Sequence, residues 1–239
     1  MTSSESAGTT GEPAGETTDG GAASPYARTP RTAPARARER VTYDRELVHA
    51  ILDDGYVCHL GFVRDGAPVV LPTLYARVGE RLYIHGSTGS RPLREACDTD
   101  PGLPACVTVT HVDGLVLAKS AFHHSINYRT VVAHGIAHQV TDHEERIQAL
   151  DAIVESVVPG RVADSRGANA KELAATAVIR VDLEEVSAKV RAGGPNDEPE
   201  DLALPYWTGV LPVAPTYGTP IPADDLSPGT PVPGYLTTR

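Results

Sequence analysis

Residues 56–84 read YVCHLGFVRDGAPVVLPTLYARVGERLYI. Three β-rich runs, 56–63, 67–78 and 81–84, are separated by Arg64-Asp65-Gly66 and by Val78-Gly79-Glu80. Short joints that contain glycine are typical of hairpin turns, because glycine readily adopts the positive φ that such turns need. This stretch therefore predicts consecutive antiparallel strands.

The same pattern of short β-rich runs separated by turns continues along the chain. Further strands are expected at 105–111, 115–120, 128–140 and 177–183, with another hairpin joint at Val112-Asp113-Gly114. Three helices interrupt them: a short one capped by Thr42 and closed by Gly55, one over 92–97, and one over 143–158 with an apolar stripe. Strands joined mostly by hairpins predict a mainly β fold, an antiparallel barrel with a few peripheral α-helices, rather than a doubly wound sheet.

Composition divides the chain into three parts. Residues 1–40 are polar and small, and we expect a disordered leader because they bury too little apolar surface to offset the entropy of ordering. The barrel domain is expected over 41–192. Proline and glycine become dense over 193–239, which predicts an extended arm that is ordered around 205–212.

The overall charge and the cysteines restrict the class of partner. A net charge of −10 and a pI near 5.3 argue against a general nucleic-acid binder, which needs clustered basic side chains. Three cysteines without CxxC spacing fit reduced thiols better than a disulfide framework. No apolar window is long enough for a transmembrane helix. We expect a cytoplasmic protein that binds a small molecule and does not bind membranes.

The segment 82–93, LYIHGSTGSRPL, is the first candidate site. It predicts a strand, a Gly/Ser loop and a helix that Pro92 opens at its first turn. Backbone N–H groups near Gly86 and Gly89, hydroxyl groups, the helix dipole and Arg91 can together hold a phosphate. An ordinary turn followed by a helix start has the same residues, so the local pattern leaves both interpretations open.

A second cluster covers 119–130 and reads KSAFHHSINYRT. Asn127, Tyr128 and Arg129 can bind the edge of a heteroaromatic ring and a phosphate, and His123 and His124 can act as acid or base near neutral pH. Adjacent residues of a strand point to opposite faces, so at most one histidine faces a given site, and a structural role stays equally open.

Three other observations concern possible ligands. The nine histidines lack HExxH or CxxC spacing, so no zinc site is expected, although one histidine can ligate a haem. Lys189 and Arg191 share one strand face and can meet an anion, or form an exposed barrel rim. Trp207, the sole tryptophan, can stack on a planar ring or anchor the arm.

Several motifs occur in an order that resembles the pyridoxamine 5′-phosphate oxidase-like proteins, and most closely their flavin-nucleotide-binding branch, which is related to nitroimidazole-resistance proteins. The resemblance spans about residues 43–213. The motifs are CHLGF at 58–62, VLPTLY at 70–75, YIHGS at 83–87 with Ser90-Arg91, HHSINYR at 123–129, SAKVR at 187–191 and WTGVLP at 207–212.

This resemblance implies an FMN-binding split barrel that forms a homodimer, with both subunits contributing to each site. Ser90 and Arg91 then grip the flavin phosphate, the segment 127–129 lies near the flavin, and Trp207 is a candidate ring contact. The hypothesis is an FMN-dependent oxidoreductase that acts on a small nitro- or heteroaromatic molecule. Its candidate acid–base residues are His85 and His124, and its other candidate cofactor contacts are Tyr83, His85, Gly86, Ser87, Asn127, Tyr128, Arg129, Lys189 and Arg191.

The chain also departs from the family's name-giving enzyme. It lacks the basic strand motif and the C-terminal arginine motif of a true pyridoxamine 5′-phosphate oxidase, so vitamin B6 synthesis is not expected. Related barrels bind haem or deazaflavin. The alternative hypothesis is a haem-binding split barrel, either an enzyme or a carrier or sensor without turnover, with His85, His123 or His124 as the ligand.

Overall fold

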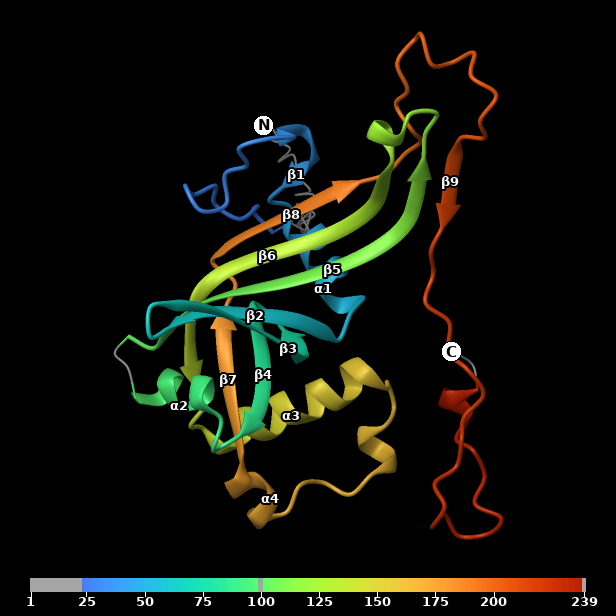
Figure 1. Ribbon diagram of the computed structural model, residues 1–239. Coiled ribbons are helices and arrows are strands. Elements are labelled where there is room, and N and C mark those ends of the chain that lie inside the picture. Colours follow the sequence, from blue (N-terminus) through green and yellow to red (C-terminus); the bar gives the residue numbers. More distant parts are fainter. Residues whose placement is uncertain (1–22, 99–100, 238–239) are drawn as a thin grey trace, which may run out of the picture.

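The computed structural model describes residues 23–98 and 101–237 and shows a curled antiparallel sheet with helices at its periphery (Figure 1). The strand order is β1-β8-β6-β7-β4-β3-β2-β5-β9, and an additional pairing of β5 with β6 closes six strands into a barrel. The predicted mainly β, antiparallel barrel is confirmed. The strands are β1 Val41–Thr42, β2 Val57–Arg64, β3 Ala67–Val78, β4 Arg81–Ser87, β5 Leu103–Leu117, β6 Ser125–Gln139, β7 Thr176–Asp182, β8 Glu185–Arg191 and β9 Gly209–Pro212.

The helices lie outside the barrel. They are α1 Arg45–Asp53, α2 Arg91–Asp98, α3 His143–Val157 and α4 Ala170–Ala175, with short 3-10 turns η1 Arg38–Arg40, η2 Ala121–His123, η3 Val162–Asp164 and η4 Gly234–Leu236. The cap of α1 is Asp44, whose side chain accepts a 2.8 Å hydrogen bond from the backbone N–H of Leu47. The predicted cap, Thr42, instead pairs with Ala188 in the sheet.

Two of the three predicted hairpins are confirmed. Asp65 and Gly66 form the β2–β3 turn with φ of 51° and 76°, and Gly79 takes φ of 59° in the β3–β4 turn. The third prediction is wrong, because 112–114 is a β-bulge inside the single long strand β5. An Asp-Gly pair suits both features, and here the carboxylate of Asp113 is held by Arg129 of the neighbouring strand.

Strand β6 changes partner part of the way along its length. It pairs with β8 from Tyr128 to His134 and with β7 from Ala137 to Gln139. Gly135 lies at the change, where an added Cβ would come within 2.9 Å of Val181 Cγ1. The absence of a side chain at this position therefore lets β7 approach β6 closely.

The buried side chains form two clusters on opposite sides of β4. Leu82 and Ile84 point into the barrel, where residues such as Tyr75, Val107 and Ile179 fill the interior. Tyr83, which alternates with them, packs against α3 together with Ile153 and Val178. Helix α3 therefore covers one outer face of the sheet.

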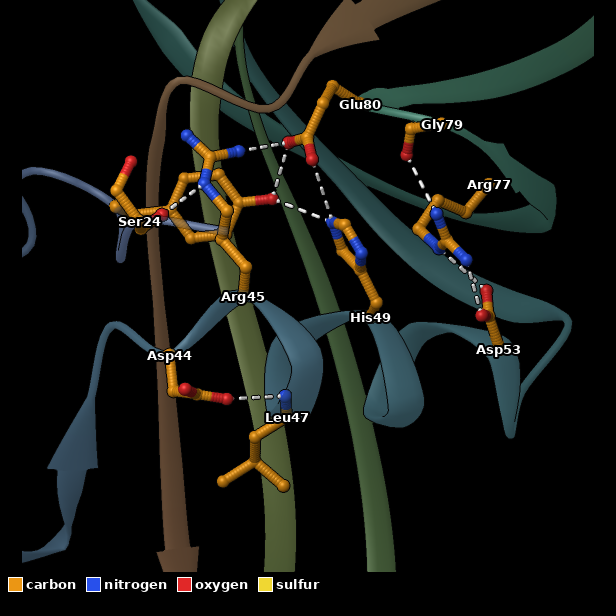
Figure 2. A network of polar contacts seen from close by, with 10 residues as sticks. Ser24, Asp44, Arg45, Leu47, His49, Asp53, Arg77, Gly79 and Glu80 are labelled. Carbon is orange, nitrogen blue, oxygen red and sulfur yellow. Dashed lines mark hydrogen bonds and ion pairs between the residues drawn. The ribbon is translucent and has the colours of Figure 1, made fainter. Parts of the chain in front are cut away.

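The described part of the leader is packed, so the predicted disorder of residues 1–40 is corrected for residues 23–40, and residues 1–22 lie outside the described part. Tyr26 is only 3% exposed, and its hydroxyl donates to Glu80 at 2.8 Å and lies 3.0 Å from His49 Nε2. Arg45 lies 4.0 Å from the Tyr26 ring centroid and pairs with Glu80 (Figure 2). One buried aromatic ring thus anchors a polar segment whose composition predicts disorder.

The residues after β8 extend along the outside of the molecule (Figure 1). Strand β9 pairs with residues 114–117 of β5, and Lys119 Nζ donates to the carbonyl oxygen of Tyr206 at 2.9 Å and to that of Leu204. Trp207 is 66% exposed. The hydroxyl of Tyr235 donates to Asp164 at 2.7 Å, which returns the end of the described arm to η3.

One edge of the barrel wall stays open. Residues 67–74 of β3 pair with β2, and among the described residues they have no strand on their other side, because β4 pairs only with residues 75–78. Pro68 and Pro72 lie in this open half, and Val70 is 61% exposed there.

We expect Tyr26→Ala to lower the free energy of unfolding by about 3–5 kcal/mol, the range for removing a buried aromatic side chain. Urea unfolding followed by circular dichroism measures it. Tyr206→Ala, at a 60% exposed tyrosine, is the control and should change stability by less than about 0.5 kcal/mol. Equal, small losses in both variants would show that residues 23–40 do not support the barrel.

Candidate functional site

The loop between β4 and α2 uses its backbone N–H groups within the protein. Thr88 N–H donates to Ala175 O at 3.0 Å, Gly89 N–H to Ser87 Oγ at 3.1 Å and Ser90 N–H to Ser87 O at 2.8 Å. These three N–H groups are therefore not free for an anion. The guanidinium and hydroxyl side chains of the loop are the other candidate contacts for one.

The side chains of the loop suit that role. Arg91 is the first residue of α2, is exposed, and has no hydrogen-bond or ion-pair partner among the described residues. A cavity of about 190 Å³ lies beside it, lined by residues that include Thr73, His85, Ser87 and Ser90. A guanidinium without a partner, together with hydroxyl groups that can still donate, favours an anionic ligand beside this cavity.

Arg94, which was not among the residues predicted from the sequence, lies three residues after Arg91 on the same helix. Its side chain is also exposed and has no partner among the residues that the structure describes. Residues three apart are neighbours on a helix surface, so the i, i+3 spacing of the two arginines was the available signal.

Gly86 has a packing role. A Cβ at this position would lie 2.5 Å from Leu93 Cδ1 of α2. The glycine therefore lets the helix lie close to the end of β4, which sets the position of Ser90 and Arg91.

The hydroxyl of Tyr83, a predicted cofactor contact, is bonded to α3 and is not free for a ligand at the loop between β4 and α2. Its hydroxyl donates to Glu145 Oε1 at 2.8 Å, and Glu145 also pairs with Arg81 and Arg180, each at 3.1 Å. Burial and the bond to Glu145 raise the pKa of Tyr83. The phenol therefore stays protonated and ties β4 to α3.

His85 has no hydrogen bond to any described residue. Its Nδ1 is shielded from solvent, and burial lowers the pKa of the imidazole. The ring is therefore neutral at neutral pH, with one nitrogen that accepts a hydrogen bond and one that donates. Of the predicted acid–base residues, His85 is the one beside the Ser90–Arg91 loop.

The residues of the second cluster lie together at the end of the β5–β6 hairpin that carries η2. Asn127 is 9% exposed, its amide donates to Gly193 O at 3.1 Å, and its oxygen accepts from Arg191. Tyr128 lies opposite Arg191 in the β6–β8 ladder, and Lys189 lies opposite Thr130. Asn127 and Arg191 therefore fix the chain where it leaves β8 for the arm.

His123 is the last residue of η2 and His124 follows it, and the two histidines differ in their contacts. His124 Nδ1 lies 3.0 Å from Ser120 O, and since a carbonyl only accepts, Nδ1 carries the proton and Nε2 keeps a free lone pair. His123 Nε2 lies 3.7 Å from Glu198. Phe122 beside them is 88% exposed.

The guanidinium of Arg129, a predicted cofactor contact, is paired with two carboxylates of this chain. Its Nε and Nη2 donate to the two oxygens of Asp113 at 3.0 and 2.9 Å, and Nη1 pairs with Asp54 at 2.8 Å. The guanidinium lowers the pKa of Asp113. Arg129 therefore holds the bulge of β5 against the end of α1.

The two clusters lie far apart in one chain (Figure 1). Asn127 precedes Ala137 by ten residues in β6, which is about 33 Å of strand. The last β6–β7 pair is Gln139 with Ile179, and β4 and β7 continue beyond it to the pair of Ser87 with Thr176. The loop 87–91 therefore lies beyond the Gln139 end of β6. Residues Ser90 and Arg91 are thus not brought to Asn127, Arg191 or Trp207 of the same chain.

Within residues 23–98 and 101–237, no group of three or more His, Cys, Asp or Glu side chains is arranged to hold a metal ion. In the same residues, no helix has both the length and the apolar character needed to cross a membrane. Cys58 and Cys106 are free thiols, and burial raises the pKa of both.

The chain is similar to known proteins over most of its length. The family model for pyridoxamine 5′-phosphate oxidase matches residues 44–190. The flavocytochrome Anf3 from Azotobacter vinelandii is 36% identical, with 89% of this chain and 98% of that chain covered and a TM-score of 0.81. An FAD- and haem-binding protein from Mycobacterium smegmatis is 38% identical, with 83% and 96% covered and a TM-score of 0.77.

A third solved structure shares the fold. It is a putative 5-nitroimidazole antibiotic resistance protein from Bacteroides thetaiotaomicron, 19% identical over 63% of this chain and 86% of that chain, with a TM-score of 0.51. No curated protein matches the sequence.

We expect the Arg129–Asp113 pair to contribute stability only while Asp113 is ionised. Its folded pKa lies below the ordinary value, so this stability is present above about pH 4 and is lost as the pH falls through the folded pKa. Asp113→Asn should cost about 1 kcal/mol at pH 7, because both side chains are partly exposed, and nothing once Asp113 is protonated.

Urea unfolding between pH 7 and pH 3 measures this difference. Asp65→Asn is the control, since Asp65 lies in an exposed turn without a partner among the described residues. A difference between wild type and Asp113→Asn that persists unchanged at pH 3 would contradict the interpretation.

Proposed function

The chain belongs to the pyridoxamine 5′-phosphate oxidase family, and we propose that it is a flavin- and haem-binding oxidoreductase that works as a cytoplasmic homodimer. The observation that carries the proposal is the similarity of more than four-fifths of the chain to two proteins described as a flavocytochrome and as an FAD- and haem-binding protein. The side chains of this protein fit both groups, each at a different end of the barrel.

Arg91, Ser87 and Ser90 would hold the flavin phosphate. They lie beside a cavity, and Arg91 has no protein counter-charge among the described residues. FMN and FAD both carry a phosphate, so these residues suit either. The sequence motifs favour FMN, and the similar FAD- and haem-binding protein makes FAD the competing choice. Neither of the two similar proteins is described as binding deazaflavin.

His124 would hold the haem. Its Nδ1–H is fixed on a backbone carbonyl, which is the arrangement that orients a ligating histidine and leaves Nε2 for the metal. Phe122 and Trp207, 88% and 66% exposed, offer apolar surface at the same end of the barrel, since Gly209, two residues after Trp207, pairs with Leu117. His123 has Glu198 beside it and suits a ligand less well.

The separation of the two clusters supports the homodimer. In one chain the loop at Arg91 and the cluster at Asn127 lie at opposite ends, whereas a second subunit can bring its own Asn127, Tyr128 and Arg191 to the loop. The exposed apolar side chains of β2 and β3, such as Val63 and Val70, give the partner a surface to bury.

When bound, the flavin supplies electron or hydride transfer. The chain would bind and orient it through Arg91 and place neutral His85 beside the cavity as a proton donor or acceptor. The substrate class to be tested is a small nitro- or heteroaromatic molecule.

The first experiment is the visible spectrum of the protein as purified, followed by mass spectrometry of the released cofactors. Flavin bands together with a Soret band are expected. A colourless protein that takes up neither added FMN, FAD nor haemin would overturn the proposal. A pigmented protein that no electron donor reduces would be a carrier or a sensor.

Arg91→Ala should weaken flavin binding by about 1.5–3 kcal/mol, the range for a hydrogen bond to a charged group. Flavin fluorescence quenching on titration of the apoprotein measures the change in Kd. Arg64→Ala removes an arginine that also lacks a partner among the described residues but lies at the β2–β3 turn, and it should leave the Kd unchanged.

His124→Ala should abolish the Soret band on haemin titration and leave the flavin Kd near the wild-type value. His143→Ala, at an exposed histidine that begins α3, is the matched control. If the Soret band survives in His124→Ala and is lost in His85→Ala, the ligand has been assigned to the wrong end of the barrel.

A further inference from the structure

A second cavity lies on the α3 side of the barrel and is distinct from the space beside the Ser90–Arg91 loop. Its volume is about 320 Å³, within the size range of small-molecule sites. It lies between the second half of α3, η3, α4 and the adjoining ends of β4 and β7. The two cavities share one residue, His85.

Part of the wall of this cavity is apolar. Leu150, Ile153 and Val154 come from α3, and Val162 comes from η3. Ile153 is 3% exposed and belongs to the core beneath α3. Such a wall favours a ligand with an apolar body, because binding removes apolar surface from water.

The charged groups at the rim disfavour an anion. Arg166 is neutralised by Glu172, with contacts of 2.7 and 3.1 Å, and Asp151 has no partner among the described residues. A negatively charged ligand would meet the unpaired carboxylate of Asp151 and find no free cation in the wall.

His85 supplies the polar contact. It forms no hydrogen bond to any described residue, its ring is neutral at neutral pH, and its Nδ1 is shielded from solvent, while Nε2 keeps some access. A half-buried imidazole without a partner loses hydrogen bonds that it would make in water. In the tautomer with the proton on the shielded Nδ1, the accessible Nε2 is the acceptor, and a ligand with one N–H or O–H donor can bond to it.

We propose that this cavity binds a compact, uncharged, mainly apolar molecule that donates one hydrogen bond to His85. The site shares His85 with the proposed flavin site but involves neither Arg91 nor His124, and its test measures ligand binding to the α3-side cavity rather than cofactor binding or turnover.

Isothermal titration calorimetry of the full-length protein, with its cofactors as purified, tests the proposal with indole as the probe. Indole is a compact apolar bicycle with a single N–H donor, and 1-methylindole has the same body without the donor. We expect one saturable indole site per chain and binding of 1-methylindole that is at least tenfold weaker. No saturable heat with indole, or equal Kd values for the two compounds, would overturn the proposal.

Two variants locate the site. Val162→Phe fills the cavity and should abolish indole binding, whereas Val232→Phe, at a 51% exposed valine of the arm, should leave it intact. Ala168→Leu narrows the same cavity and serves if Val162→Phe unfolds. Indole affinity that is unchanged in folded Val162→Phe or Ala168→Leu protein would place the binding elsewhere.

A third variant tests the hydrogen bond. His85→Phe keeps an aromatic ring but removes both ring nitrogens, so it should bind indole and 1-methylindole equally. A tenfold preference for indole that persists in His85→Phe would contradict the role of the imidazole.

Discussion

The antiparallel ladder between β5 and β6 is the constraint on which the rest of the structure depends. Each of these strands also pairs with two others: β5 with β2 and β9, and β6 with β7 and β8. Without the β5–β6 pairing the barrel would be an open sheet with two more edges. The ladder also sets the separation of the two candidate clusters, because the α2 loop and the η2 hairpin end lie at its opposite ends.

The local elements could be predicted because their signals are local. The turns at Asp65-Gly66 and Gly79 need residues that accept a positive φ, and the stripe of α3 repeats with the helical period. The bulge at 112–114 could not, since Asp-Gly suits a turn and a bulge equally. The contact that favours the bulge comes from Arg129, sixteen residues away on the adjacent strand, whose guanidinium donates two hydrogen bonds to the Asp113 carboxylate.

The same dependence on distant partners limits what a sequence says about a site. Arg91 and Arg129 are identical side chains in polar contexts, yet one is unpaired and the other is held by two carboxylates, one of them from the residue that follows α1. Likewise, the burial of Tyr26 depends on Glu80 and Arg45, which lie outside the leader. Residue type and spacing identified the family and the candidate residues, and tertiary contacts decided which of them are free to meet a ligand.

The two prolines on the open half of β3 limit how this protein can associate. A proline lacks the N–H that an incoming strand needs, so Pro68 and Pro72 interrupt the row of donors along an otherwise exposed edge. Strand-by-strand growth into a fibril, the usual hazard of such an edge, is thereby discouraged. Contacts on this side must instead come from the side chains that project from the barrel wall, and side-chain packing permits a closed assembly with a defined number of copies.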